Sequence, residues 1–78
     1  MSVLINKKEM LNVARQKYRA LSIDYDDRAD VLYIQISDKK RTLDNRINGD
    51  YIRSYNNGEL VGITILDAVE NYRLGFKF

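Results

Sequence analysis

The spacing of apolar residues changes along the chain, and the change predicts where a helix gives way to strands. Within residues 7–21 the apolar side chains gather on one face of a helical wheel. They are Met10, Leu11, Ala14, Tyr18 and Leu21. Asn6 can cap this segment, and Glu9 stands three positions later, as in a capping box. The pattern predicts an amphipathic helix over residues 7–19.

Beyond residue 20 the period of the pattern falls to two, which is typical of strands. Apolar and polar residues alternate over residues 21–25 and again over residues 32–36. Three further runs of strand character cover residues 42–47, 51–55 and 59–66. The chain therefore contains five predicted strands.

Two Asn-Gly pairs separate the last three runs. Asn48-Gly49 and Asn57-Gly58 each offer two residues that accept positive φ, as a type I′ hairpin turn requires. Asp67 can then cap a last short helix, with Glu70 as its capping-box partner and Gly75 as the residue that ends it. We predict an α+β fold with an N-terminal amphipathic helix, a five-stranded antiparallel β-meander and a short C-terminal helix.

The length of 78 residues predicts a single domain, with a helical extension over residues 1–20 and a β-rich core over residues 21–78. A domain of this size buries only about 60% of the surface that its unfolded chain exposes. The chain has no cysteine, so disulfides and thiolate metal sites are excluded as reinforcement. Association of two copies would add buried area, and we expect a homodimer.

The composition also limits the chemistry. The chain has no histidine, which removes imidazole-dependent triads and the commonest zinc ligand, and we expect no cofactor, no metal and no enzymatic activity. The net charge of +2 indicates no partner by itself. We find neither a signal-peptide pattern nor an apolar run of the roughly 20 residues that a membrane span needs, and we expect a soluble cytoplasmic protein without a membrane partner.

An acidic cluster precedes the second predicted strand. Its members are Asp24, Asp26, Asp27 and Asp30. A calcium loop begun at Asp24 would need an oxygen ligand, a glycine and a glutamate where this chain has Arg28, Ala29 and Gln35. A pair of catalytic carboxylates would need a cleft that so small a sheet has little room to form. We therefore interpret Asp26 and Asp30 as residues that bond to backbone amides in a β-turn, and Asp24 as a solvated strand residue.

Basic side chains are concentrated in the predicted helix and in the loop after residue 38. They are Lys8, Arg15, Lys17, Arg19, Lys39, Lys40 and Arg41, followed by Arg46. Such residues can contact phosphates and bind nucleic acid with salt-sensitive affinity. No aromatic residue is interleaved on this helix face for base stacking, and the alternative is a solvated, ion-paired surface. Nucleic-acid binding is the second hypothesis.

Aromatic residues supply the candidates for a dimer or partner interface. We expect Tyr33, Tyr51 and Tyr55 on the second face of the sheet, where they would be covered or used as an interface. Leu74, Phe76 and Phe78 alternate with Gly75 and Lys77, which is a strand period. This tail can fold back onto its own sheet or dock reciprocally on a second subunit, and we favour the dimer.

Several segments together resemble a known family. They are Tyr25-Asp26, Asp30-Val31-Leu32-Tyr33-Ile34, Asn57-Gly58-Glu59-Leu60-Val61-Gly62-Ile63 and Ile65-Leu66-Asp67-Ala68. Over residues 23–70 the chain resembles the small prokaryotic family known as domain of unknown function 2283. The resemblance implies a compact β-rich domain without assigned activity, and an antitoxin-like or accessory role beside a small partner protein. We expect a non-catalytic interaction module, with nucleic-acid binding through the basic helix as the alternative.

Overall fold

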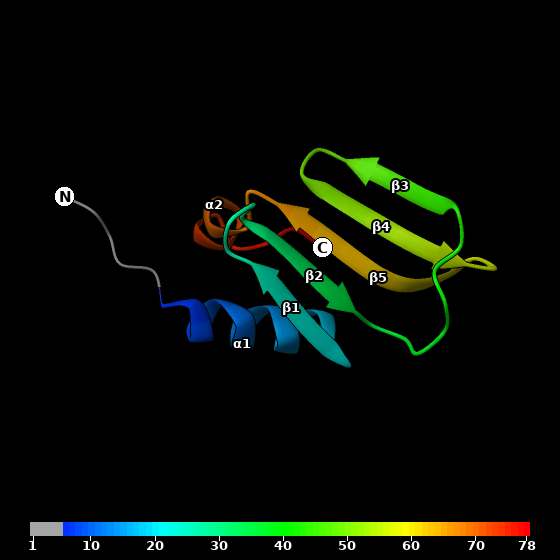
Figure 1. The fold of residues 1–78 in the computed structure, drawn as a ribbon, viewed down its shortest axis with the longest axis horizontal. Helices are drawn as coiled ribbons and strands as arrows, with labels where there is room; N and C mark the ends of the chain where they lie inside the picture. The colour runs from blue at the N-terminus through cyan, green and yellow to red at the C-terminus, as the bar shows by residue number, and fades with distance from the viewer. Residues whose placement is uncertain (1–5) are drawn as a thin grey trace.

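The computed structural model describes residues 6–78 as one antiparallel sheet with two helices (Figure 1). The elements follow in the order α1 (Lys7–Tyr18), β1 (Ser22–Asp26), β2 (Val31–Gln35), β3 (Asp44–Asn48), β4 (Tyr51–Asn56), β5 (Glu59–Leu66) and α2 (Ala68–Arg73). The predicted α+β class, its five strands and both helices are confirmed. Residues 1–5 of the predicted helical extension lie outside the described residues.

The strand order is β1-β2-β5-β4-β3, so the sheet is not a continuous meander. The connection of residues 36–43 carries the chain from β2 to the far edge, and β3, β4 and β5 then return toward β2 (Figure 1). Burial explains this order. The strand β5 is buried at five consecutive positions, Val61 to Ile65, and a central strand is covered on both faces. The strand β3 is exposed throughout and occupies the edge.

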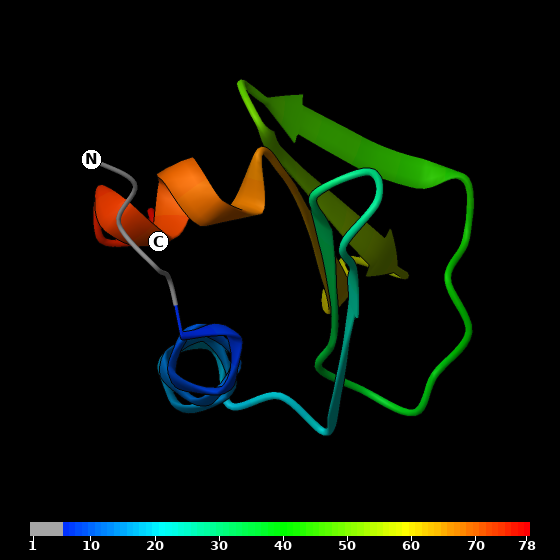
Figure 2. The ribbon, with the colours of Figure 1, turned by 60° about the vertical axis from the view of Figure 1, so that its left-hand side comes forward.

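Both helices cover the same face of the sheet, and the core lies between them and that face (Figure 2). One cross-strand row of the core runs through Tyr25, Leu32, Ile65 and Tyr51. Met10, Ala14 and Tyr18 are the buried residues of α1, as the helical spacing predicts. The side chain of Asn6 accepts a hydrogen bond from the Glu9 amide at 3.3 Å, which confirms the predicted N-cap.

The two hairpins differ in their turns. Asn57 and Gly58 have φ of 50° and 80°, so both central residues are left-handed, as predicted for a type I′ turn. The prediction for Asn48-Gly49 is displaced by one residue, because Asn48 belongs to β3 and pairs with Tyr51. The turn residues are Gly49, with φ of 60°, and Asp50. Glycine at the first central position is typical of a type II′ turn.

The connection of residues 36–43 passes on the side of the sheet away from the helices (Figure 2). It approaches the backbone closely at Gly62. A Cβ atom added to Gly62 would lie 2.9 Å from a guanidinium nitrogen of Arg41 and 3.1 Å from the Ile34 carbonyl oxygen. A side chain at this position would have to displace the Arg41 guanidinium and would crowd the Ile34 carbonyl, which favours glycine here.

Candidate functional site

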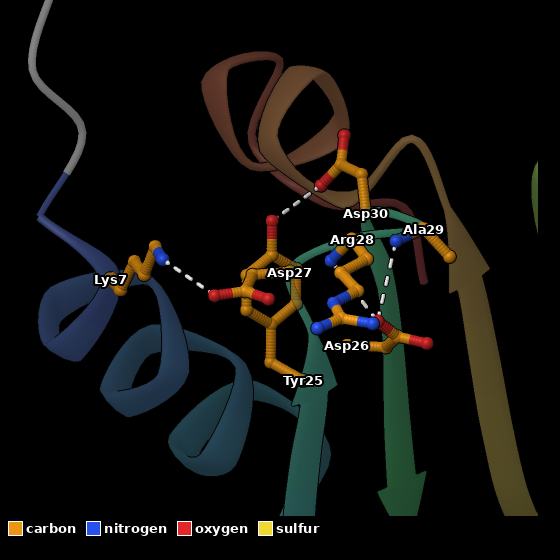
Figure 3. Close-up of polar contacts among 7 residues, drawn as sticks. All are labelled: Lys7, Tyr25, Asp26, Asp27, Arg28, Ala29 and Asp30. Atoms are coloured by element: carbon orange, nitrogen blue, oxygen red, sulfur yellow. Dashed lines mark hydrogen bonds and ion pairs between the residues drawn. The ribbon is translucent and has the colours of Figure 1, made fainter.

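The acidic cluster forms the turn between β1 and β2, as predicted (Figure 3). The Asp26 carboxylate accepts hydrogen bonds from the amides of Arg28 at 3.1 Å and Ala29 at 3.3 Å. These bonds close the turn locally, which is the ordinary role of an aspartate at this position. The side chain of Asp27 points outward and pairs with Lys7 at 3.2 Å, with both partners exposed. Asp24 is an exposed residue of β1, as expected.

Asp30 was predicted to bond to an amide of its own turn, and this is wrong, because the partners of its carboxylate lie in β1 and α2. Its φ is 55°, in the left-handed region that aspartate tolerates better than most residues. One carboxylate oxygen accepts hydrogen bonds from the Tyr25 hydroxyl at 2.7 Å and from the Val69 amide at 3.2 Å. The Asp30 carbonyl accepts a further bond from the Ala68 amide at 3.1 Å. Asp30 therefore joins the β1–β2 turn to the first turn of α2.

This arrangement corrects the predicted cap of α2. Asp67 is the N-cap residue, but its φ of 48° is left-handed and its side chain makes no capping hydrogen bond. The Asp30 carboxylate from the β1–β2 turn bonds to an unpaired amide of the first turn instead. No local pattern could show this contact, because the partners are separated by 39 positions.

Tyr25 is the titratable partner of Asp30. Burial, the hydrogen bond to Asp30 and the negative charge of that carboxylate raise the pKa of Tyr25 to about 12. The phenol therefore stays protonated and donates to Asp30 at neutral pH. Within residues 6–78, no group of three or more acidic side chains is placed to hold a metal ion, and the same residues form no pocket. What the turn does in this structure is organise the backbone.

The predicted basic surface is divided between two sides of the sheet. Lys8, Arg15, Lys17 and Arg19 are exposed on α1 or at its end, on the helix side. Lys39, Lys40 and Arg41 belong to the connection on the opposite side (Figure 2). Lys39 pairs with Glu59 at 3.0 Å, and Arg41 lies against Gly62. The described residues therefore bring the two groups to different sides and do not join them into one basic track.

The predicted interface residues lie in different environments, some inside the core and some on the surface. The side chains of Tyr51 and Phe76 are 1% and 4% exposed, inside the core of the protomer. Tyr51 shares a cross-strand row with Ile65 and Leu32, so its predicted position on the second face is wrong. Tyr33 pairs with Thr64 on that second face and is exposed, as predicted. Tyr55 pairs with Asp44 on the face that Tyr51 occupies, so its predicted position is also wrong. It is half-buried beside the Arg46 guanidinium, 4.6 Å from its ring centroid.

The C-terminal tail folds back onto its own protomer and is not a strand. Leu74 ends α2 and is exposed, while Phe76 packs against the rings of Tyr18 and Tyr72 with centroids 6.0 Å and 5.8 Å away. The Lys77 amide donates to the Tyr51 hydroxyl at 2.8 Å, and the Tyr18 hydroxyl donates to the Lys77 carbonyl. The preferred hypothesis of a tail docked on a second subunit is therefore not supported for Phe76, which is already buried.

Phe78 takes a different position from Phe76. Its side chain is half exposed and contacts Tyr51 edge-on at a centroid distance of 5.5 Å. The Arg53 guanidinium lies 4.5 Å from the centroid of the Phe78 ring. Arg53 also stands directly opposite Arg46 on the adjacent strand, so two like charges meet across β3 and β4.

The edge strand β3 is exposed along its whole length, which the sequence patterns did not single out. All five residues of β3 are exposed, and Leu43 and Ile47 are 99% and 74% exposed. Asp44 and Arg46 lie between these apolar residues, on either side of Asn45, and their side chains are 3.6 Å apart. The signal in the sequence was the low apolar content of residues 44–48, which is unsuited to the centre of a sheet.

Comparison with known proteins adds a family match. A family model described as protein of unknown function (DUF2283) matches residues 22–68, from the start of β1 to the start of α2. The match confirms the resemblance seen in the sequence and leaves α1 outside the matched segment. No curated protein and no solved structure matches the chain.

Proposed function

This chain belongs to the DUF2283 family of proteins of unknown function, and from that premise we propose that it is a non-catalytic interaction module that acts as a homodimer. The observation that carries the proposal is the edge strand β3, whose five residues are all exposed. An edge of this kind offers unpaired backbone donors and acceptors to another strand. A second copy of the chain can supply that strand, because it is present wherever the first copy is.

The chemistry of the acidic turn supports a non-catalytic role. Asp26 and Asp30 direct their carboxylates toward backbone amides of the turn and of α2. A general acid or base would have to release such bonds to reach a substrate. The two carboxylates that most resembled a catalytic pair thus have hydrogen-bond partners in the fold itself, and these partners explain their positions.

Light scattering after size exclusion tests the proposal on the full chain. We expect the mass to rise from the monomer value toward twice that value as the loading concentration increases from about 1 μM to about 1 mM, because the dissociation constants of weak association lie in this range. A mass that stays at the monomer value throughout would contradict the proposal.

The antitoxin-like or accessory role is a finer proposal that rests on the family resemblance. It predicts that the adjacent gene encodes a small toxin-like protein and that the two purified proteins form a complex of defined stoichiometry. Mixing the purified pair and measuring the mass by light scattering tests it. Two separate peaks at the masses of the free proteins would contradict this role, without bearing on the homodimer.

Nucleic-acid binding has less support from the arrangement of charges. Its candidate residues lie on two sides of the sheet, and Lys39 is already paired with Glu59. If the basic helix binds, replacing Lys8, Arg15 and Arg19 with alanine should lower the slope of log affinity against log salt by about one for each phosphate that is no longer neutralised. A retardation assay in low salt without a shifted band would remove this alternative.

A further inference from the structure

We propose that two copies of this chain pair through their β3 strands, antiparallel and in the register that places Asn45 of one copy opposite Asn45 of the other. The inference rests on the proposed homodimer and names its surface. It would join the two sheets edge to edge into one sheet. Neither the family match nor the predicted tail contact assigns this edge.

The backbone of β3 leaves suitable groups at the edge. Asn48 and Tyr51 flank the two-residue turn, so their pair exchanges both hydrogen bonds, and such pairs alternate along an antiparallel ladder. Asp44, Arg46 and Asn48 therefore direct their backbone groups toward β4. Asn45 and Ile47 direct theirs away from the sheet, where a second strand can pair with them. The Asn45 amide donates locally to the Leu43 carbonyl at 3.1 Å, and this one bond must open when the strands pair.

Charge complementarity selects the register. When the two-fold axis passes through Asn45, Asp44 of each copy stands opposite Arg46 of the second copy, so that two ion pairs form across the interface. Within the chain Arg46 faces Arg53, and two like charges on opposite positions destabilise a sheet. The Asp44 carboxylate of the second copy would lie beside Arg46 in the same cross-strand row and offset the repulsion between the two arginines. We call the side chains of Asp44 and Arg46 from both copies the charged row. A register centred on Arg46 would instead place the two Arg46 side chains against each other.

The exposed apolar residues agree with the same register. Leu43 of each copy stands opposite Ile47 of the second copy, and these two side chains are 99% and 74% exposed in the single chain. Ile47 lies on the same face of β3 as Asn45, opposite the side chains of Asp44 and Arg46. Leu43 precedes β3 at a bend, and it would join that face once the Asn45–Leu43 bond opens and the strand extends by one residue. Pairing therefore removes the two most exposed apolar side chains near this edge from water at the same time as it pairs the charges. Because a short edge buries little area, we expect a reversible, concentration-dependent dimer.

Mixing two charge-reversal variants tests the charged row. The Asp44→Arg variant carries two positive residues in the row and the Arg46→Asp variant carries two negative ones, so neither can form its own intrachain ion pair. We expect each alone to dimerise at least about tenfold more weakly than the unmodified chain, and an equimolar mixture to recover a heterodimer, since each cross-strand position is then complementary. Sedimentation velocity measures all three samples. Glu70→Arg reverses a comparable exposed charge on α2, paired with Arg73 at 3.7 Å, and should leave dimerisation unchanged.

Cysteine crosslinking tests the register independently, and it decides the matter if a charge variant fails to fold. The chain has no cysteine, so Asn45→Cys introduces a single thiol. Directly opposed residues of an antiparallel pair lie about 4.5–5.5 Å apart between Cα atoms, within the range that a disulfide spans. We expect a disulfide-linked dimer of Asn45→Cys under mild oxidation and little from Ile47→Cys, whose counterpart is offset along the strand. A dimer that shows neither heterodimer recovery nor Asn45→Cys crosslinking would overturn this register and leave the proposed function standing, whereas a chain that is monomeric throughout would overturn both.

Discussion

Asp30 shows how a single side chain in the acidic turn connects distant parts of the fold. It adopts a left-handed backbone conformation and accepts bonds from Tyr25 and from the Val69 amide. An apolar residue there would leave the first turn of α2 with one more unpaired amide. The sequence could predict that Asp30 lies in a turn. Its partners could not be predicted, because they depend on the position of α2, which is set by the place of β5 in the sheet.

The Asp30→Ala substitution should destabilise the protein by about 2 kcal/mol, because it removes two hydrogen bonds to a charged group and an aspartate suited to positive φ. Asp27→Ala is the matched control, since the Asp27–Lys7 pair is exposed and should contribute less than about 0.5 kcal/mol. Urea unfolding of both variants measures the difference. Equal effects of the two substitutions would contradict the role given to Asp30.

We predict that ionisation of the Tyr25 phenol at alkaline pH lowers the stability of the folded protein. The pKa of Tyr25 is raised from 10.0 to about 12 in the folded protein, so the folded state holds the phenol proton more tightly than the unfolded chain does. This contribution is complete below pH 10.0, declines above that value and is lost above about pH 12. Comparing Tyr25→Phe with the unmodified chain isolates the effect of this tyrosine, because burial also raises the pKa of Tyr18. The stability gap between the two proteins should stay constant below about pH 10 and narrow above it, and a gap that does not change up to about pH 11 would exclude this explanation.

At the scale of elements, local signals predicted the pieces better than their arrangement. Local features were sufficient to predict α1 and the β4–β5 hairpin, because each feature depends only on neighbouring residues. These features are the change of period, the Asn6 cap and the Asn57-Gly58 turn. The strand order required a comparison between strands. The burial of β5 on both faces agrees with its place between β2 and β4.

The tail was the element most affected by tertiary contacts. Its strand-like alternation predicted extended structure, yet Phe76 is buried among Tyr18 and Tyr72 while Phe78 stays half exposed. Two residues with the same side chain thus occupy different environments. Pattern alone does not distinguish folding back from docking on a second subunit, because both bury the same apolar positions.

Phe76→Ala should therefore cost about 3 kcal/mol of unfolding free energy, the range for an aromatic residue removed from a core. Phe78→Ala should cost about 1 kcal/mol, because the Phe78 ring packs against Tyr51 and Arg53 at a half-exposed position. Chemical denaturation of both variants provides the comparison. A cost for Phe78→Ala equal to or larger than that for Phe76→Ala would show that the tail packs differently from the structure described.

At the scale of the whole molecule, the described residues 6–78 form a thin sheet with one face covered by helices and with β1 and β3 as its two edge strands (Figure 1). Of the two, β3 is exposed at every position, whereas β1 is half-buried at alternate positions. The described part of the chain has no helix long and apolar enough to cross a membrane. The small size and the lack of cysteine predicted self-association, and the apolar alternation of residues 74–78 placed the expected contact at the tail. The structure instead favours a contact at β3, because that is where exposed apolar residues and opposite charges occur together.

The most direct test of association through this edge is a concentration series of amide resonances by nuclear magnetic resonance on the full chain. The Ile47 amide points away from β4 and should shift, and gain protection from hydrogen exchange, as the dimer forms. The Arg46 amide is bonded within the hairpin and should be protected at every concentration. We predict that the shifts cluster in residues 43–47. Spectra that do not change up to about 1 mM, or shifts confined to the tail or to α1, would contradict association through β3.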